Sequence, residues 1–305
     1  MNVKFPFLHP LFASHLLVAT YAETTFAEPV AGSADERGKI VARSVEQGEY
    51  MLYTPTDKPR GILVVVHGSL SDDGSAMEAA DVFLHRWVDE AEKRQLLLIA
   101  PAFDQENYGG HAGPGGGYRG LFGRHVGADE FLNSIVDAVA TAHPPVKAKF
   151  YLYGHSAGGQ FVSRYVVKHP QRIFAAVISS AAGFPFPDPD VAWTNGMARL
   201  QRRIRWSDDA PWEQFEYQPD PNNWVEAATL PITVVVGSRD TAKVKPGPGQ
   251  RGDNHVSRGR EWRKAMNAYA REHGKRGRVG FIKVQGIGHN SKLLTPKSIE
   301  AMWRE

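Results

Sequence analysis

The feature that most restricts the fold of this sequence is a regular alternation of two kinds of segment from about residue 48 onward. Short runs rich in Val, Ile and Leu alternate with longer stretches in which apolar residues recur with helical spacing. The strand-like runs are residues 49–55, 61–68, 96–101, 149–154, 175–180, 232–237 and 279–286. The helix-like stretches are residues 75–94, 129–142, 159–170, 256–272 and 291–304. Continuous apolar strands separated by helices predict an α/β fold with a mostly parallel, twisted sheet flanked by helices.

Two segments interrupt this alternation. Residues 104–124 are too rich in glycine for a regular element. Residues 183–229 are rich in proline and hold four of the chain's seven tryptophans. These are Trp193, Trp206, Trp212 and Trp224. We expect residues 183–229 to be a cap inserted over the C-terminal edge of the sheet. Its aromatic side chains either face a substrate cleft or form the core of the cap itself, and the sequence favours neither.

The N-terminal segment has the features of a signal peptide. Lys4 precedes a mostly apolar stretch, and Ala27 is a suitable cleavage point. We therefore expect residues 1–27 to direct export, residues 28–47 to form an N-terminal extension, and residues 48–305 to form the folded domain. The protein would be secreted or periplasmic if the signal functions, and cytoplasmic if the segment is only a disordered extension. No later stretch approaches the ~18 continuous apolar residues that span a bilayer, so no membrane insertion is expected.

Charge and composition argue against nucleic-acid and metal partners. The formal net charge is only +3 over 305 residues. Basic clusters at residues 202–205 and 275–278 lack a nucleic-acid-binding motif, so we interpret them as solvated surface. The chain has no cysteine, which excludes disulfides, thiolate metal sites and a cysteine nucleophile. No clear metal-ligand spacing or phosphate-binding glycine loop occurs, so we expect neither a metal nor a cofactor.

The stretch YGHSAGG, residues 153–159, places a serine between two glycines, directly after a strand-like run and before a helix-like one. It fits the pattern G-x-S-x-G in the strand–turn–helix context that a nucleophilic serine requires. Gly154 and Gly158 permit the close approach of neighbouring segments that such a turn imposes. Ser156 would then stand at the C-terminal edge of the sheet, beside a helix N-terminus that favours negative charge. The alternative is an ordinary glycine-rich turn in which Ser156 caps the helix.

A nucleophilic serine needs a base, and the base needs a carboxylate that orients it. In a sheet of this kind both groups should follow later strands, in the order serine, acid, histidine. Asp240 comes directly after one of the later strand-like runs, and His289 comes after the last of them. We therefore predict that Ser156, Asp240 and His289 are the catalytic residues, with Asp253 as the rival acid.

A further part of the predicted site is the loop that begins at His67, Gly68 and Ser69, where an early strand ends. Such a loop can direct a backbone amide at the serine. The expected oxyanion-hole donors are the amides of Ser69 and Ala157, and Leu70 competes with Ser69 for the first position. We expect His67 to brace this loop through hydrogen bonds rather than to take part in catalysis.

Four motifs in this order, HGS, GHSAGG, VVVGSRDT and GIGHNS, resemble those of the α/β-hydrolase superfamily. The resemblance covers roughly residues 48–305. Within the superfamily, residues 154–183 look most like bacterial secreted esterases related to polyhydroxyalkanoate depolymerases. The resemblance implies the α/β-hydrolase fold and a serine-dependent carboxylic ester hydrolase that forms an acyl-enzyme. The chain departs from many such depolymerases because it lacks cysteine and an evident polymer-binding domain.

The glycine-rich loop and the cap would both emerge at the edge of the sheet where Ser156 lies. The candidate substrate contacts in these two segments are Tyr108, His111, Tyr118, Phe122 and Trp193. Because the motifs supply no arginine clamp, we predict a neutral, partly apolar ester, either a small molecule or a polymer segment. The alternatives are a peptidase or another acyl hydrolase on the same fold, and a binding protein that has the fold without the activity.

Overall fold

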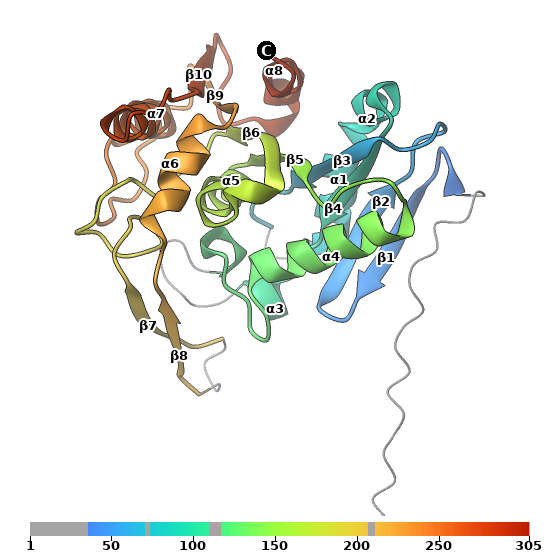
Figure 1. Ribbon diagram of the computed structural model, residues 1–305, viewed down its shortest axis with the longest axis horizontal. Helices are drawn as coiled ribbons and strands as arrows, with labels where there is room; N and C mark the ends of the chain where they lie inside the picture. The colour runs from blue at the N-terminus through green and yellow to red at the C-terminus, as the bar shows by residue number, and fades with distance from the viewer. Residues whose placement is uncertain (1–35, 71–73, 110–116, 207–210, 305) are drawn as a thin grey trace, which may run out of the picture.

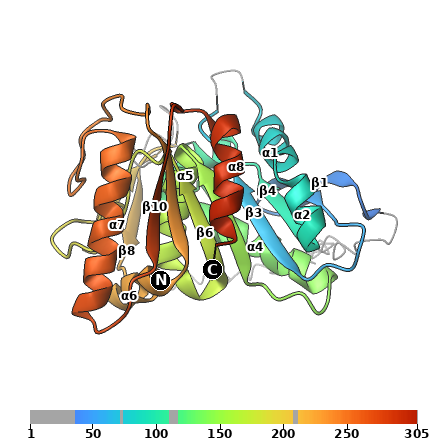
Figure 2. The ribbon, with the colours of Figure 1, turned by 90° about the horizontal axis from the view of Figure 1, so that it is seen from above.

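The computed structural model describes residues 36–70, 74–109, 117–206 and 211–304 (Figure 1). The predicted signal segment and the candidate contact His111 lie outside these residues. The described chain is built around one large sheet with helices on both faces (Figures 1 and 2). Among its helices, none combines the length and the apolar character needed to cross a bilayer.

The sheet has eight strands in the order β1-β2-β4-β3-β5-β6-β9-β10. The strands are β1 (Ile40–Val45), β2 (Gly48–Tyr53), β3 (Gly61–Val66), β4 (Leu96–Pro101), β5 (Phe150–His155), β6 (Ile173–Ser179), β9 (Ile232–Gly237) and β10 (Val279–Val284). All neighbours from β4 to β10 are parallel, whereas β2 is antiparallel to both β1 and β4. The predicted α/β fold with a mostly parallel sheet is confirmed.

Different helices cover the two faces of the sheet. Successive side chains of a strand point to opposite faces, so Ile62 and Val64 on β3 join one apolar core while Leu63 and Val65 join the other. The helices are α1 (Ala76–His85), α2 (Val88–Arg94), α3 (Gln105–Tyr108), α4 (Ala128–Ala142), α5 (Ala157–Lys168), α6 (Pro221–Thr229), α7 (His255–Glu272) and α8 (Ser291–Met302). Buried residues of α4, α5, α6 and α7 fill the first core, and those of α1, α2 and α8 fill the second (Figure 2).

The sheet begins before the domain boundary that was expected at residue 48. β1 lies within the segment expected to be an N-terminal extension, and it pairs along its whole length with β2. β1 forms one edge of the sheet, and its side chains are all exposed or partly exposed. It therefore lacks the continuous apolar run that identifies the central strands in the sequence.

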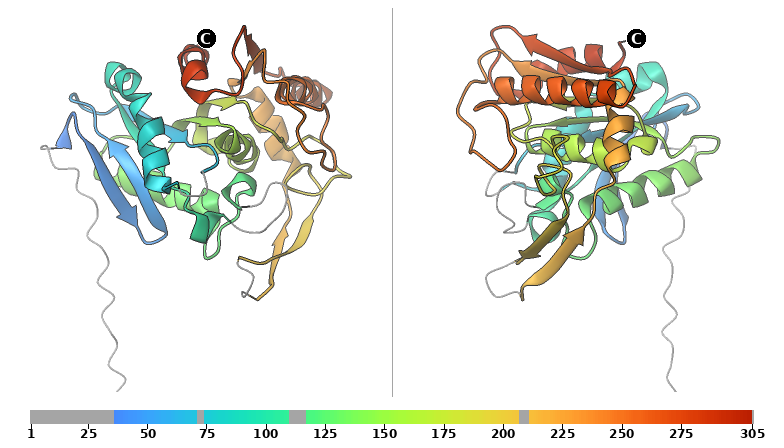
Figure 3. Two further views of the ribbon diagram at one scale, coloured as in Figure 1. Left: turned by 180° about the vertical axis from the view of Figure 1, so that it is seen from behind. Right: turned by 60° about the vertical axis from the view of Figure 1, so that its left-hand side comes forward.

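Residues 183–229 contain a hairpin and a helix. The antiparallel strands β7 (Leu200–Ile204) and β8 (Glu213–Tyr217) form the hairpin, which projects from the body of the molecule (Figures 1 and 3). The helix, α6, packs against α5 and α7 and so belongs to the layer that covers the sheet. Within this segment the β7–β8 hairpin therefore extends beyond the sheet and its covering helices, whereas α6 does not.

Three of the four tryptophans in this segment pack it onto the body of the molecule. Trp193, Trp206 and Trp224 are buried in the first core, whereas Trp212 is exposed. The rings of Trp193 and Trp224 meet edge to face with centroids 5.9 Å apart. Of the two interpretations of these aromatic residues, the buried positions favour a packing role.

Candidate active site

Ser156 forms the sharp turn between β5 and α5, which end and begin at its two neighbours. Its backbone has φ 57° and ψ −114°. Non-glycine residues rarely adopt a positive φ, and such strain costs about 1–3 kcal/mol. The N–H of Ser156 donates to the carbonyl oxygen of Ser179 on β6 at 2.9 Å. Although Ser156 occupies the N-cap position of α5, its side chain makes no capping hydrogen bond, so Oγ is available for chemistry.

The glycines on either side of Ser156 are required because β3, β5 and α5 approach one another very closely. A Cβ atom on Gly158 would lie 2.4 Å from the carbonyl oxygens of Val66 and His67. A Cβ atom on Gly154 would lie 2.3 Å from the carbonyl oxygen of Gly158. A side chain at either position would therefore push α5 away from the sheet and displace Ser156.

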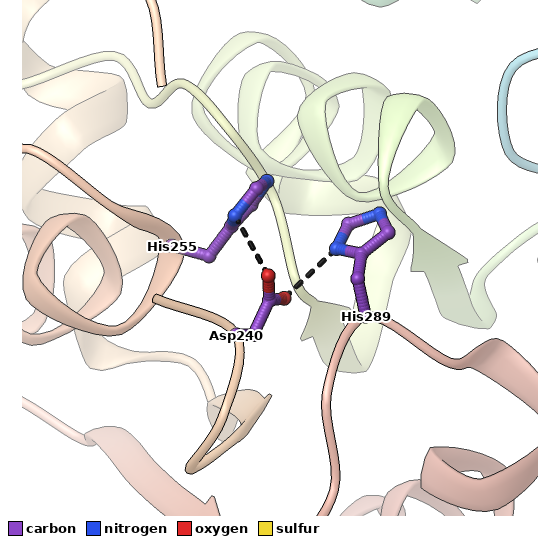
Figure 4. Close-up of side chains that lie close together, drawn as sticks. All are labelled: Asp240, His255 and His289. Atoms are coloured by element: carbon purple, nitrogen blue, oxygen red, sulfur yellow. Dashed lines mark hydrogen bonds and ion pairs between the residues drawn. The ribbon is translucent and has the colours of Figure 1, made fainter. Parts of the chain in front are cut away.

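Asp240 and His289 follow β9 and β10 and lie together at one edge of the sheet (Figure 4). Nδ1 of His289 hydrogen-bonds Oδ2 of Asp240 at 2.8 Å. Burial acts to raise the pKa of Asp240, but its contacts with His255 and His289 outweigh burial and hold that pKa well below its ordinary value. Because an ionised carboxylate accepts from Nδ1, the proton of a neutral His289 sits on that atom. Nε2 is then able to accept a proton.

The parallel strands bring Ser156 to the same edge as this pair. The strands β5, β6, β9 and β10 are successive parallel neighbours. The residues that follow them therefore lie at the C-terminal ends of these strands, on one side of the sheet. His155, which directly precedes Ser156, has its ring centroid 4.9 Å from that of His289. The three predicted catalytic residues therefore gather in one region.

A second histidine, which sequence reasoning missed, contacts the same carboxylate (Figure 4). Nδ1 of His255 lies 3.0 Å from Oδ1 of Asp240, and its ring centroid is 4.6 Å from that of His289. The rival acid Asp253 is occupied elsewhere, because it accepts a hydrogen bond from Ser257. His255 is the first residue of α7, and its only signal in the sequence is the start of that helix.

Asp240, His255 and His289 form the one group of potential metal ligands identified among the described residues. Their ligand atoms lie within 4.8 Å of one another. Imidazole nitrogen and carboxylate oxygen are donors that suit Zn²⁺. The same carboxylate–imidazole contact also orients a catalytic base, which is the role that the neighbouring Ser156 favours.

His67 braces the loop that follows β3. Its side chain is fully buried, Nδ1 donates to the carbonyl oxygen of Gly68 at 2.7 Å, and Nε2 accepts the N–H of Phe103 at 3.1 Å. Tyr118 adds a hydrogen bond from its hydroxyl to the same Gly68 oxygen at 2.8 Å. A Cβ atom on Gly68 would lie 3.7 Å from Cβ of Ser156. These contacts hold the start of the predicted oxyanion loop, which continues with Ser69 and Leu70, beside the serine.

We expect buried His67 to make the protein less stable in acid. Burial lowers the pKa of His67 from 6.5 to about 4, so between these values the unfolded chain binds a proton that the folded chain excludes. Stability from this residue is complete above pH 6.5 and is lost as the pH falls toward 4, by roughly 3 kcal/mol. Urea unfolding should therefore show a shallower acid decline in His67→Gln than in wild type. The exposed His125 provides a control, and equal declines in wild type, His67→Gln and His125→Gln would contradict the prediction.

The candidate aromatic contacts in the glycine-rich loop face the interior. Tyr108 and Tyr118 are buried, and both pack on Phe103, Tyr118 with a stacked ring at 4.8 Å. Phe122 is also buried and meets Phe215 of the hairpin edge to face at 5.7 Å. Tyr108 and Tyr118 nevertheless line a small cavity together with Ser69 and Leu70. Their position favours support of the loop, with contact to a ligand only through that cavity.

The sheet, the strained serine and the carboxylate–imidazole pair define a serine hydrolase of the α/β-hydrolase class. The chain belongs to the family whose model is described as "Serine aminopeptidase, S33", which matches residues 57–211 of the 305. The resemblance to α/β hydrolases that the four motifs indicated is thereby confirmed. No curated protein matches the sequence significantly.

Two solved structures share the fold over nearly the whole chain. LpqC, a poly(3-hydroxybutyrate) depolymerase from Bordetella parapertussis, is 20% identical with a TM-score of 0.70, covering 92% of this chain and 94% of that one. Poly(aspartic acid) hydrolase-1 from Sphingomonas sp. KT-1 is 21% identical with a TM-score of 0.66, covering 88% and 99%. At these identities the comparison establishes the common architecture.

Proposed function

We propose that the protein hydrolyses carboxylic esters through an acyl-enzyme intermediate. In this proposal Ser156 is the nucleophile, His289 is the general base and acid, and Asp240 orients His289. The observation that carries it is the 2.8 Å hydrogen bond between His289 Nδ1 and Asp240 Oδ2, at the sheet edge where Ser156 is held with φ 57°.

In the first half of the reaction, Ser156 Oγ attacks the acyl carbon of the ester while its proton passes to Nε2 of His289. The resulting oxyanion accepts hydrogen bonds from the amide of Ala157 and from that of Ser69 or Leu70. When the tetrahedral intermediate collapses, the acyl group stays on Oγ and the leaving alkoxide takes the proton from His289. Water then attacks the acyl-enzyme and gives a proton to His289, which returns it to Oγ as the carboxylic acid leaves.

Peptide hydrolysis is the second candidate, because the matching family model is described as that of a serine aminopeptidase. An aminopeptidase must bind the free α-ammonium group of its substrate, and an ammonium group is best paired with a carboxylate. The cavity that lies one helical turn from Ser156, at Gln160, has four basic residues and no acidic residue in its described lining. The described lining therefore offers an α-ammonium group no carboxylate partner, which argues against an aminopeptide substrate.

Covalent labelling tests the proposal at the nucleophile, and a substrate panel tests the bond that is cleaved. A fluorophosphonate should form one adduct, which peptide mass mapping should locate on Ser156. The panel compares p-nitrophenyl esters of increasing acyl length, a polyester film and an aminoacyl p-nitroanilide. We expect turnover of the esters, and preference for the anilide or an adduct on another residue would overturn the proposal.

We also expect His255 to act as a positioning residue through its contact with Asp240. His255→Phe removes this contact to a charged group, worth about 1.5 kcal/mol, so kcat should fall about tenfold while KM changes little. His255→Asn, which keeps a polar nitrogen in the position of Nδ1 beside Oδ1 of Asp240, should recover most of the rate. Steady-state kinetics on one p-nitrophenyl ester measure both variants. A wild-type kcat in His255→Phe, or equal losses in the two variants, would contradict this role.

A further inference from the structure

The cavity beside Ser156 is lined by basic side chains that come from separate parts of the chain. Its volume is about 350 Å³. The basic residues in its lining are Arg119, Arg164, Lys245 and Arg258. The other lining residues that the structure describes are neutral, so the cavity has a net positive charge. A cavity whose described lining is positive and holds no acidic residue attracts an anionic group of a ligand.

Two helices place this cavity next to the catalytic residues. Gln160, which lines it, lies in the first turn of α5, four residues after Ser156 and about 6 Å further along the chain direction of the helix. Arg258 is three residues after His255 and lies on the side of α7 that faces Asp240. The cavity lining thus includes one residue a turn along α5 from Ser156 and one residue a turn along α7 from His255.

Arg164 places a buried positive charge at this cavity without a carboxylate partner. Its side chain is 1% exposed. Nε donates to the carbonyl oxygen of Thr194 at 2.9 Å, Nη1 to that of Arg119 at 3.1 Å, and Nη2 to Oδ1 of Asn195 at 3.3 Å. Burial lowers the pKa of Arg164 to about 9, which still leaves it a cation at neutral pH. Its charge is compensated only by neutral dipoles, since it forms no ion pair within the described residues.

Arg258 is a second buried arginine in the lining of the cavity. It is 4% exposed, and it donates to the carbonyl oxygens of Gly252 at 3.2 Å, Lys245 at 2.8 Å and Ala182. Asp253 attracts Arg258 electrostatically but does not line the cavity. The two guanidinium groups therefore fix the walls of the cavity and add positive charge to it.

Lys245 adds an accessible cation to the same lining. It lies in the segment between β9 and α7, shortly after Asp240, and its side chain is exposed. Within the described part of the chain it makes no ion pair with an acidic residue. Its ammonium group can therefore move to meet a ligand, whereas the two buried arginines are held by carbonyl groups.

We infer that this cavity binds a carboxylate of the substrate, so that the preferred ester carries a negative charge on its acyl side. This inference rests on the proposed ester hydrolysis at Ser156. The rise of about 6 Å from Ser156 to Gln160 only sets the scale of the acyl spacer, so the test uses a three-carbon spacer of comparable length. This anionic ester replaces the neutral ester that was predicted from the sequence motifs, because the basic residues come together only in the folded chain.

The test compares two ethyl esters of similar length, ethyl hydrogen glutarate and ethyl pentanoate, by the release of ethanol. Wild type should have a higher kcat/KM for the anionic ester by about tenfold at low ionic strength, and added salt should reduce this preference. Lys245→Glu should lower the preference about tenfold. Lys243→Glu, which reverses an exposed charge two residues away from Lys245 and outside the cavity lining, should change it less than about twofold. No preference in wild type, or equal effects of the two variants, would overturn the inference.

Binding separates this inference from the proposed function. In Ser156→Ala, calorimetry should detect ethyl hydrogen glutarate at a lower Kd than ethyl pentanoate, with the difference reduced in Ser156→Ala/Lys245→Glu. If wild type hydrolyses ethyl pentanoate but Ser156→Ala shows no such difference, the carboxylate site is wrong and the ester hydrolase stands. If neither these esters nor the p-nitrophenyl esters are hydrolysed, the proposed function fails, and equal Kd values would then refute the carboxylate site as well.

Discussion

Replacing Ser156 with alanine is expected to lower kcat/KM for p-nitrophenyl esters by a factor on the order of 10⁵ to 10⁶. Without Oγ no acyl-enzyme can form, and His289 and Asp240 then have no nucleophile to activate. The loss should appear in kcat, while the Kd for a bound ester changes little. Hydrolysis assays on wild type and Ser156→Ala, each purified free of host esterases, measure the difference.

The matched control is Ser163→Ala, two turns further along α5. Ser163 is buried, and its hydroxyl donates to the carbonyl oxygen of Gln160 at 2.8 Å, so its loss should affect stability but change kcat less than severalfold. Ser156→Gly adds a second readout, because glycine accepts a positive φ without strain. It should raise the free energy of unfolding by about 1 kcal/mol while abolishing activity. Substantial activity in Ser156→Ala would show that another residue is the nucleophile.

Asp240→Asn should lower kcat by a factor on the order of 10³ to 10⁴. The side-chain amide of this variant can donate a hydrogen bond to Nδ1 of His289, so the proton of the neutral imidazole then sits on Nε2. A protonated Nε2 cannot accept the proton of Ser156. It also removes the negative charge that stabilises the imidazolium. Because the pKa of Asp240 is held well below its ordinary value, wild type should show no loss of kcat from its titration above about pH 4. A pH profile of kcat for both proteins measures these effects.

Asp253→Asn is the matched control for this prediction, because Asp253 was the rival acid in the sequence. Its contact with Ser257 lies at the start of α7, so the substitution should change kcat less than about threefold. A larger loss in Asp253→Asn than in Asp240→Asn would assign the acid to Asp253. The pH dependence of the free energy of unfolding is an independent test of Asp240. Its lowered pKa stabilises the folded state above about pH 4, and this contribution disappears as the pH falls below that value.

The central strands and the turn at Ser156 could be predicted because their signals are local. β3 and β4 are buried along their whole length, so each is a continuous apolar run, and the close approach around Gly158 requires glycine at a fixed spacing. β1 has no such signal because it lies at an exposed edge. The helix at the end of residues 183–229 was also not anticipated, since α6 begins at Pro221, after its N-cap Asp220, in a proline-rich context.

Contacts between distant segments could not be read from the sequence. His255 reaches Asp240 only because α7 begins beside the end of β9, and no spacing rule links the two residues. The basic cavity likewise combines Arg119, Arg164 and Arg258, which are far apart in the chain. The residues next to them in the sequence share no common pattern. The sequence contains no arginine motif from which the positive charge of this cavity could be predicted.

The hydrogen bonds of Arg164 and Arg258 to main-chain carbonyls also affect how this protein can diversify. A carbonyl oxygen is present whatever the side chain, so the contacts to residues 119, 182, 194 and 245 depend on the path of the backbone rather than on the side chains there. Gly252 is the exception, because its φ of +91° favours glycine. Residues such as Lys245 can then be exchanged while the wall keeps its shape. Randomising such exposed positions is therefore a route to new substrate ranges that leaves the catalytic scaffold in place.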